Sequence, residues 1–145
     1  MAFDKISLFS YLYGNKELEN LSANKEVKVS SVEGLALLTA LSYLENKRKM
    51  FFLFPTIYEA ENFIQFLGDY VDENETYIFP YDEIFRTSAI GVSPEMNEER
   101  LMALSSIHSN KPSILVAHMS SVSLSIMNEK EYEDSLFNIK TGDMI

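Results

Sequence analysis

The stretch Met50–Leu67, which reads MFFLFPTIYEAENFIQFL, decides the fold. It opens with five apolar residues, Met50–Phe54, and Pro55 ends this run. A continuous apolar run of this length fits an internal strand of a parallel sheet that is covered on both faces. Behind it, apolar residues recur at helical spacing, and Thr56 is a suitable N-cap for that helix. The apolar stripe consists of Ile57, Ala60, Phe63, Ile64, Leu67 and Val71.

The same alternation of strand and helix continues on both sides of this stretch. The other expected elements are strands at 27–29, 76–79 and 113–117, and helices at 34–44, from 94 onward and at 120–127. Ser93 can cap the helix that begins at Pro94, because proline suits the first helical position. Strands that alternate with helices form a mainly parallel sheet with right-handed crossovers and helices on both faces. We therefore predict an α/β fold.

Composition excludes several classes of protein. The 145 residues include no cysteine, which excludes disulfides, thiolate catalysis and Cys-ligated zinc. The absence of cysteine also fits a reducing, cytoplasmic setting. No run of 18 apolar residues is present, so we predict no membrane span. The net charge is −10, with 12 basic against 22 acidic residues. Because nucleic-acid affinity comes largely from Lys and Arg, this charge argues against tight DNA binding by the chain alone.

Apolar character divides the chain into three parts. Residues 3–21 are amphipathic, and apolar character falls again near residues 128–134. We expect an N-terminal helical segment at residues 1–24, an α/β domain at 25–128, and a linker at 129–145 that contains the truncated start of a further domain.

The turn that enters the first long helix is the natural place for a phosphate loop, and it lacks the residues for one. It consists of Ser30, Ser31, Val32, Glu33, Gly34 and Leu35. A working phosphate loop needs several glycines and a Lys, whereas this turn has one glycine and no basic residue. Glu33 would also repel phosphate groups. We predict a plain strand-to-helix turn that binds no nucleotide.

Other candidate residues give weaker signals. Asp82 and Glu83 follow a strand end, where a paired acid and base or a magnesium site can lie, and His118 follows another strand. An alternative hypothesis is therefore a small nucleotide- or metabolite-binding enzyme that uses these three residues. His108 lies near a helix C-terminus, where a cation is favoured, and Arg100 is suited to a structural clamp with an acid. Our preferred prediction contains no catalytic, cofactor-binding or metal-binding residue.

Several short motifs together carry a resemblance to a known family. Their order resembles the N-terminal module of bacterial transcription-repair coupling factor, and the likeness covers about residues 25–145. The motifs are Phe54–Ala60 (FPTIYEA), Phe79–Glu83 (FPYDE), Ser93–Glu95 (SPE), Glu99–Leu101 (ERL), Ile114–Ala117 (ILVA) and Ser135–Asp143 (SLFNIKTGD).

The resemblance implies a fold and a function. In this family the module is similar to the excision-repair subunit UvrB, and it keeps a degenerate helicase-type fold, like that of P-loop NTPases, without the phosphate loop. The full-length family protein is an ATP-driven DNA translocase that displaces stalled RNA polymerase and recruits UvrA for nucleotide excision repair. Its ATP, magnesium and DNA sites lie in later motor domains. The resemblance therefore implies a noncatalytic N-terminal fragment without a cofactor of its own, which packs on later domains.

Overall fold

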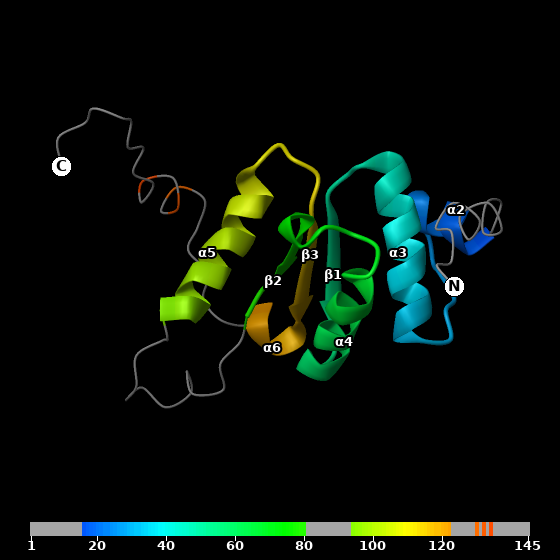
Figure 1. Cartoon of the computed structure of the whole chain (residues 1–145), viewed down its shortest axis with the longest axis horizontal. Helices are drawn as coiled ribbons and strands as arrows, with labels where there is room; N and C mark the ends of the chain where they lie inside the picture. The colour runs from blue at the N-terminus through cyan, green and yellow to red at the C-terminus, as the bar shows by residue number, and fades with distance from the viewer. Residues whose placement is uncertain (1–15, 81–93, 123–129, 131, 133, 135–145) are drawn as a thin grey trace.

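The computed structural model describes residues 16–80, 94–122, 130, 132 and 134. In this part of the chain, a three-stranded parallel sheet in the order β1-β3-β2 lies between two layers of helices (Figure 1). The elements are α2 (Lys16–Ser22), α3 (Val32–Asn46), β1 (Met50–Phe54), α4 (Ile57–Leu67), the 3-10 helix η1 (Glu73–Glu75), β2 (Thr76–Ile78), α5 (Pro94–His108), β3 (Ile114–His118) and α6 (Met119–Val122). The predicted α/β fold with a parallel sheet is confirmed.

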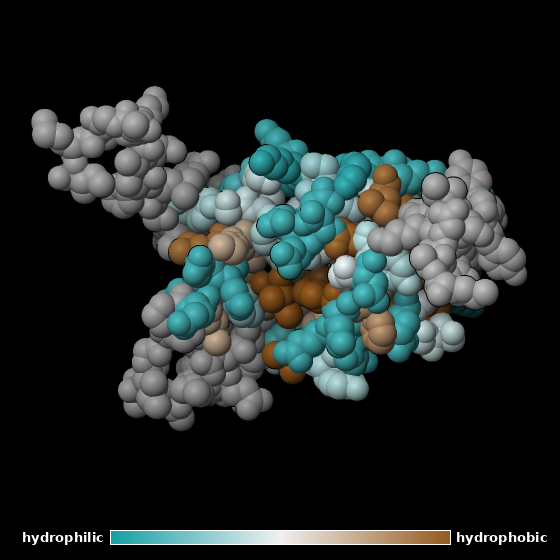
Figure 2. Space-filling view, viewed as in Figure 1, coloured by the Kyte–Doolittle hydropathy of each residue, from teal (hydrophilic) through white to brown (hydrophobic). Residues whose placement is uncertain are grey.

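Strand β3 forms the centre of the sheet, and all five of its residues are buried. Ile114 and Val116 belong to a core cluster with α3 and α4, whereas Leu115 and Ala117 belong to a second cluster with α5. Because side chains alternate along a strand, these clusters lie on opposite faces of the sheet. Figure 2 shows apolar side chains gathered in the middle of the face in view, with hydrophilic side chains around them.

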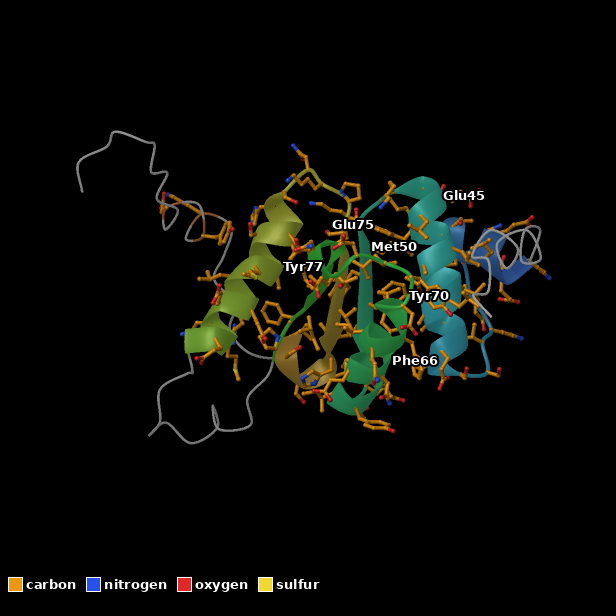
Figure 3. The ribbon with its side chains drawn as sticks, viewed as in Figure 1. Glu45, Met50, Phe66, Tyr70, Glu75 and Tyr77 are labelled. Atoms are coloured by element: carbon orange, nitrogen blue, oxygen red, sulfur yellow. The ribbon has the colours of Figure 1, made fainter. Side chains whose placement is uncertain are left out.

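The larger core cluster lies between the sheet and the helices α3 and α4. The ring of Phe63, which is fully buried, lies 4.9 Å from the Phe52 ring and 5.0 Å from the Phe54 ring. Phe66 and Tyr70 are partly buried against the same cluster (Figure 3). The strand-and-helix unit predicted from Met50–Leu67 is therefore present, and its apolar stripe faces the sheet.

The predicted cap of α4 is also present. The backbone N–H of Glu59 donates to Thr56 Oγ1 at 3.2 Å, and the Thr56 hydroxyl donates to Glu59 Oε2 at 2.9 Å. This reciprocal pair satisfies an N–H group that the first helical turn leaves without a partner.

A charged contact joins the end of α3 to η1, the 3-10 helix just before β2. Lys47 caps α3 in the left-handed conformation, with φ of 41°, and its Nζ lies 2.8 Å from Glu75 Oε2. The same Nζ lies 4.7 Å from the centre of the Tyr43 ring. Burial, followed by the negative charge of Glu75, raises the pKa of Tyr43 to about 12. These contacts fix the turn between the first helical layer and the sheet.

The expectation for β1 is wrong in one respect. The run Met50–Phe54 was expected to be an internal strand covered on both faces, but in the described part of the chain β1 lies at the sheet edge. Phe51 is 57% exposed and Leu53 is 44% exposed. The reason is that α5 packs against β2 and β3, so its layer stops short of β1.

The expected strand at 27–29 is absent. The backbone N–H of Lys28 donates instead to the carboxylate of Glu17, at 2.8 Å, so a side chain of α2 takes the bond that a neighbouring strand would accept. Helix α2 packs on α3 through Leu18, Leu21, Leu38 and Leu41. The boundaries predicted at 24 and 128 stay predictions.

Some expectations fall wholly or partly outside the described residues. Helix α5 begins at Pro94 as expected, but its proposed cap, Ser93, lies outside them, as do residues 3–15 of the amphipathic segment and the segment from Ser135. The helix expected at 120–127 begins at Met119 and is described as far as Val122. Among the described helices, none has the length and apolar character that a membrane crossing requires.

Candidate functional site

The N-terminus of α3, where a phosphate loop would hold an anion, is occupied by the protein's own groups. Ser31 has extended backbone angles, and its Oγ accepts a hydrogen bond from the Gly34 N–H at 3.2 Å. Hydrogen bonds from its own backbone and from the Ser31 hydroxyl lower the pKa of Glu33, an exposed carboxyl. A carboxylate near a helix N-terminus complements the helix dipole, so this end already has a cap and a negative charge.

Gly34 has no structural need to be glycine. A Cβ atom built on it would meet only Ser31 Oγ, at 3.5 Å, which is an ordinary contact, and its backbone is not left-handed. In a phosphate loop, glycine is needed because the backbone must approach the anion closely. The six-residue turn Ser30–Leu35 thus has the geometry of an ordinary helix cap, and the absence of a nucleotide there stays a prediction.

At the carboxyl end of the sheet, His118 is held inside the fold. It is the last residue of β3 and is 3% exposed. Its backbone N–H donates to Ser121 Oγ at 3.2 Å, and the Ser121 hydroxyl donates to the His118 carbonyl at 2.8 Å. Burial lowers the pKa of His118, while the charge of Glu61 acts in the opposite direction. The environment therefore favours the neutral imidazole.

The structure leaves the alternative enzyme hypothesis untested, because two of its three residues, Asp82 and Glu83, lie outside the described residues. A general base must reach the proton that it abstracts, and the buried ring of His118 offers little surface for a substrate. In the described parts, no group of three or more His, Cys, Asp or Glu side chains is placed to hold a metal ion.

Arg100 and His108 have contacts that sequence reasoning did not foresee. The Arg100 guanidinium lies 5.1 Å from the centre of the Phe79 ring, so α5 is held against the end of β2 by a cation–π contact. The predicted acidic partner of Arg100 stays a prediction. The His108 ring stacks on Tyr132, with 4.6 Å between centres and 10° between planes. No sequence spacing signals either contact, because the partners lie far apart along the chain.

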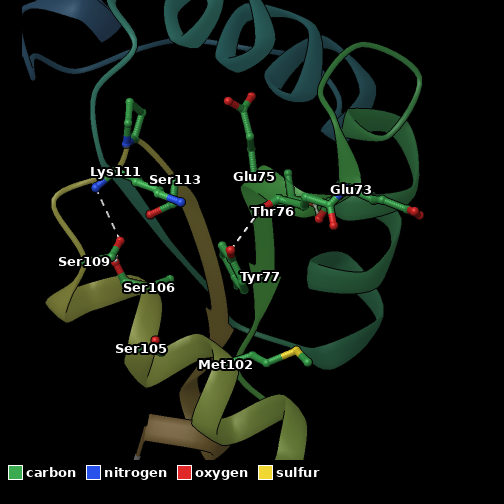
Figure 4. A pocket seen from close by; sticks show the side chains of 12 residues that line it. Glu73, Glu75, Thr76, Tyr77, Met102, Ser105, Ser106, Ser109, Lys111 and Ser113 are labelled. Carbon is green, nitrogen blue, oxygen red and sulfur yellow. Dashed lines mark hydrogen bonds between the residues drawn. The ribbon is translucent and has the colours of Figure 1, made fainter. Parts of the chain in front are cut away.

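An open cleft of about 670 Å³ lies between β2 and the C-terminal half of α5 (Figure 4). Ser105, Ser109 and Lys111 line it, and the Lys111 backbone N–H donates to Ser109 Oγ at 3.4 Å. The cleft adjoins Thr76 and Ser113, at the starts of β2 and β3. Ligands of open α/β sheets bind beyond the carboxyl ends of the strands, so this cleft lies at the opposite end.

A second, apolar groove of about 290 Å³ lies between β1 and α5. Its lining includes Met50, Phe51, Ile107 and Leu115. The Lys49 Nζ donates to the Ile107 carbonyl and so ties the start of β1 to the end of α5. The groove suits an apolar protein segment better than a reacting substrate, because its lining offers few polar groups to orient one.

The described residues form a parallel α/β module. Their polar contacts at these sites mainly hold its helices and strands in place. Comparison with known proteins relates it distantly to transcription-repair-coupling factors. The chain is 20% identical over 132 residues to the protein of that name from Staphylococcus haemolyticus (strain JCSC1435). It has the same identity, over the same length, to the proteins of that name from Staphylococcus epidermidis RP62A and ATCC 12228.

The similarity covers most of this chain but little of its relatives. The matched region is 90% of this chain and 11% of each relative, so the chain spans about one ninth of their length. No protein-family profile matches the chain. No solved structure matches it either.

Proposed function

We propose that the chain is a noncatalytic α/β module of a transcription-repair coupling factor. The observation that carries the proposal is the similarity to proteins of that name over 90% of the chain. The cap at the N-terminus of α3 supports it, because Ser31 and Glu33 occupy the position where a nucleotide-binding relative would hold phosphate.

In this proposal the module works through its neighbours. The complete protein is an ATP-dependent DNA translocase that acts on stalled RNA polymerase and recruits UvrA in the cytoplasm. ATP, magnesium and DNA are bound by motor domains elsewhere in that protein. The net charge of this chain is −10, which supports the assignment of DNA binding to those domains.

Calorimetry on residues 1–145 tests the noncatalytic part. We expect no binding heat with Mg-ATP up to millimolar concentrations, because the turn at Gly34 has no Lys and carries a carboxylate. The matched variant Glu33→Gln removes the charge without adding a phosphate ligand, and we expect it to bind no better. Micromolar binding by either protein would contradict the proposal.

Strand-specific repair of ultraviolet lesions tests the biological part. Disruption of the gene that encodes this chain is expected to slow repair of transcribed strands to the rate of nontranscribed strands. Repair of the nontranscribed strands should be unchanged, which controls for a general repair defect. An undiminished preference for the transcribed strand would refute a role in coupling.

A further inference from the structure

Helix α3 is apolar on two faces, and a different part of the chain covers each face. Ala36, Ala40 and Tyr43 belong to the core cluster on the side of the sheet. The outer face carries Leu38 and Leu41, which are only 7% and 3% exposed. A helix that is apolar on both sides has to be buried on both sides. Helix α2 provides the cover on the outer face.

This cover is a short unit with hydrogen bonds of its own. It consists of α2 and the linker behind it, residues 16–28, which we call the strap. From the end of α2 the linker returns along α3 to the start of that helix (Figure 1). The Lys28 N–H donates to the Glu17 carboxylate at 2.8 Å, and the Lys25 N–H donates to the Asn20 carbonyl at 2.8 Å. Because these bonds join parts of the strap to one another, they persist when the strap moves as a body.

The strap docks on α3 and on the turn behind that helix. Leu18 packs against the outer leucines of α3. The Arg48 guanidinium donates hydrogen bonds to the Leu21 and Ser22 carbonyls, both at 2.8 Å. These carbonyls end α2, where a positive charge is favoured. The Ser22 and Ser42 hydroxyl oxygens lie 3.1 Å apart. Docking therefore uses a buried leucine, a capped helix end and a pair of hydroxyls.

A short exposed link joins the strap to α3. Val29 is 38% exposed, and Ser30 is also exposed. Ser31 already belongs to the cap of α3, since its Oγ accepts the Gly34 N–H. Two extended residues span about 7 Å. A change of direction at Val29 and Ser30 would thus release the strap and leave both its internal bonds and the cap of α3 intact.

We propose that the outer face of α3 is a docking site for the strap of a second copy of this chain, so that two copies exchange straps. An exchanged strap makes the same contacts on the partner copy that it makes on its own, so exchange loses little free energy. A different protein would have to supply both the leucine and a helix end placed on Arg48. The strap of the same copy is tethered beside its site at about millimolar effective concentration. Exchange should therefore grow as the chain concentration approaches that range.

Disulfide trapping between two variants tests the exchange. The chain has no cysteine, and the 3.1 Å between the Ser22 and Ser42 hydroxyl oxygens puts thiols at these positions within reach of a disulfide. Copies with Ser22→Cys are mixed with copies with Ser42→Cys, from micromolar to millimolar concentration, and oxidised with diamide. The control mixture pairs Ser42→Cys with Ser105→Cys, an exposed position on α5. At millimolar concentration we expect at least about tenfold more linked dimer than in the control, because docking holds the two thiols together.

Two further variants show whether the linkage comes from docking. Leu18→Asp in the Ser22→Cys copy should reduce the linkage to the control level, whereas Glu26→Gln, at an exposed position of the strap, should leave it unchanged. Equal linkage in the two mixtures, or linkage that survives Leu18→Asp, would overturn the proposal. So would a Ser42→Cys thiol that reacts with iodoacetamide but does not link to Ser22→Cys, because the strap would then lift and leave α3 to a different protein.

Discussion

Replacing Gly34 with alanine should stabilise the chain. Gly34 lies in the first turn of α3, and an added Cβ would meet only Ser31 Oγ, at 3.5 Å. Its backbone is not left-handed, so alanine can adopt the same conformation without strain. The substitution therefore lowers the conformational entropy of the unfolded chain without a steric cost in the folded one.

The expected gain follows from helix propensities. Glycine in a helix costs about 0.5–1 kcal/mol relative to alanine. For a chain of this length, that gain corresponds to a rise in Tm of about 1–4 °C. A phosphate loop would give the opposite result, because a side chain at a glycine that approaches the anion interferes with binding.

Urea unfolding followed by circular dichroism measures the change, with and without Mg-ATP. Gly68→Ala is the matched control, since Gly68 ends α4 with helical angles and its added Cβ would also meet only ordinary contacts, at 3.5 Å. We expect both variants to gain stability and neither to respond to Mg-ATP. A loss of about 1 kcal/mol or more in Gly34→Ala, beside a stable Gly68→Ala, would refute the reasoning.

Four further variants test other parts of the fold. The folded pKa of Tyr43, about 12, exceeds its unfolded value near 10, so its stabilising effect is complete below pH 10 and is lost as the pH rises toward 12. Tyr43→Phe should therefore reduce the fall in the urea midpoint of unfolding over this pH range. The lowered pKa of His118 gives stability above its ordinary value of 6.5 that is lost as the pH falls below it, and His118→Gln should reduce the difference between midpoints at pH 7.5 and 5.5. Phe63→Ala should lower the free energy of unfolding by about 3–5 kcal/mol, because its ring is fully buried. Leu53→Ser in residues 1–145 should change it by less than about 1 kcal/mol. Equal losses in the two variants would contradict the exposure of β1.

The elements that short-range patterns specify could be predicted from the sequence. The stripe of α4 and its Thr56 cap are local features, because a helix repeats every 3.6 residues and a cap reaches three residues ahead. The buried strand β3 and the start of α5 at Pro94 were also predictable for this reason. At the entry to α3, the missing Lys and the presence of Glu33 were visible directly in the sequence.

Contacts between distant residues could not be predicted. The bond from Lys28 to Glu17 replaces an expected strand, and the ring contacts of Arg100 and His108 join residues that no motif links. The apolar groove between β1 and α5 belongs to this group as well. Its walls come from separate elements, and its position depends on how far one helix extends over the sheet.

The wrong prediction for β1 leaves apolar side chains and backbone groups on an open edge of the described sheet. Phe51 and Leu53 are about half exposed, so covering them would gain about 1 kcal/mol each. Their four outward backbone groups would add about 1 kcal/mol per hydrogen bond. A total of roughly 4–6 kcal/mol, before ordering costs, corresponds to dissociation constants from about 1 mM to a few tens of micromolar for a separate partner. A segment tethered in the same polypeptide has an effective concentration of about millimolar, so it would dock with the same contacts. The apolar run Met50–Phe54 has the pattern of an internal strand, because apolar character alone does not show whether a further strand lies beside it.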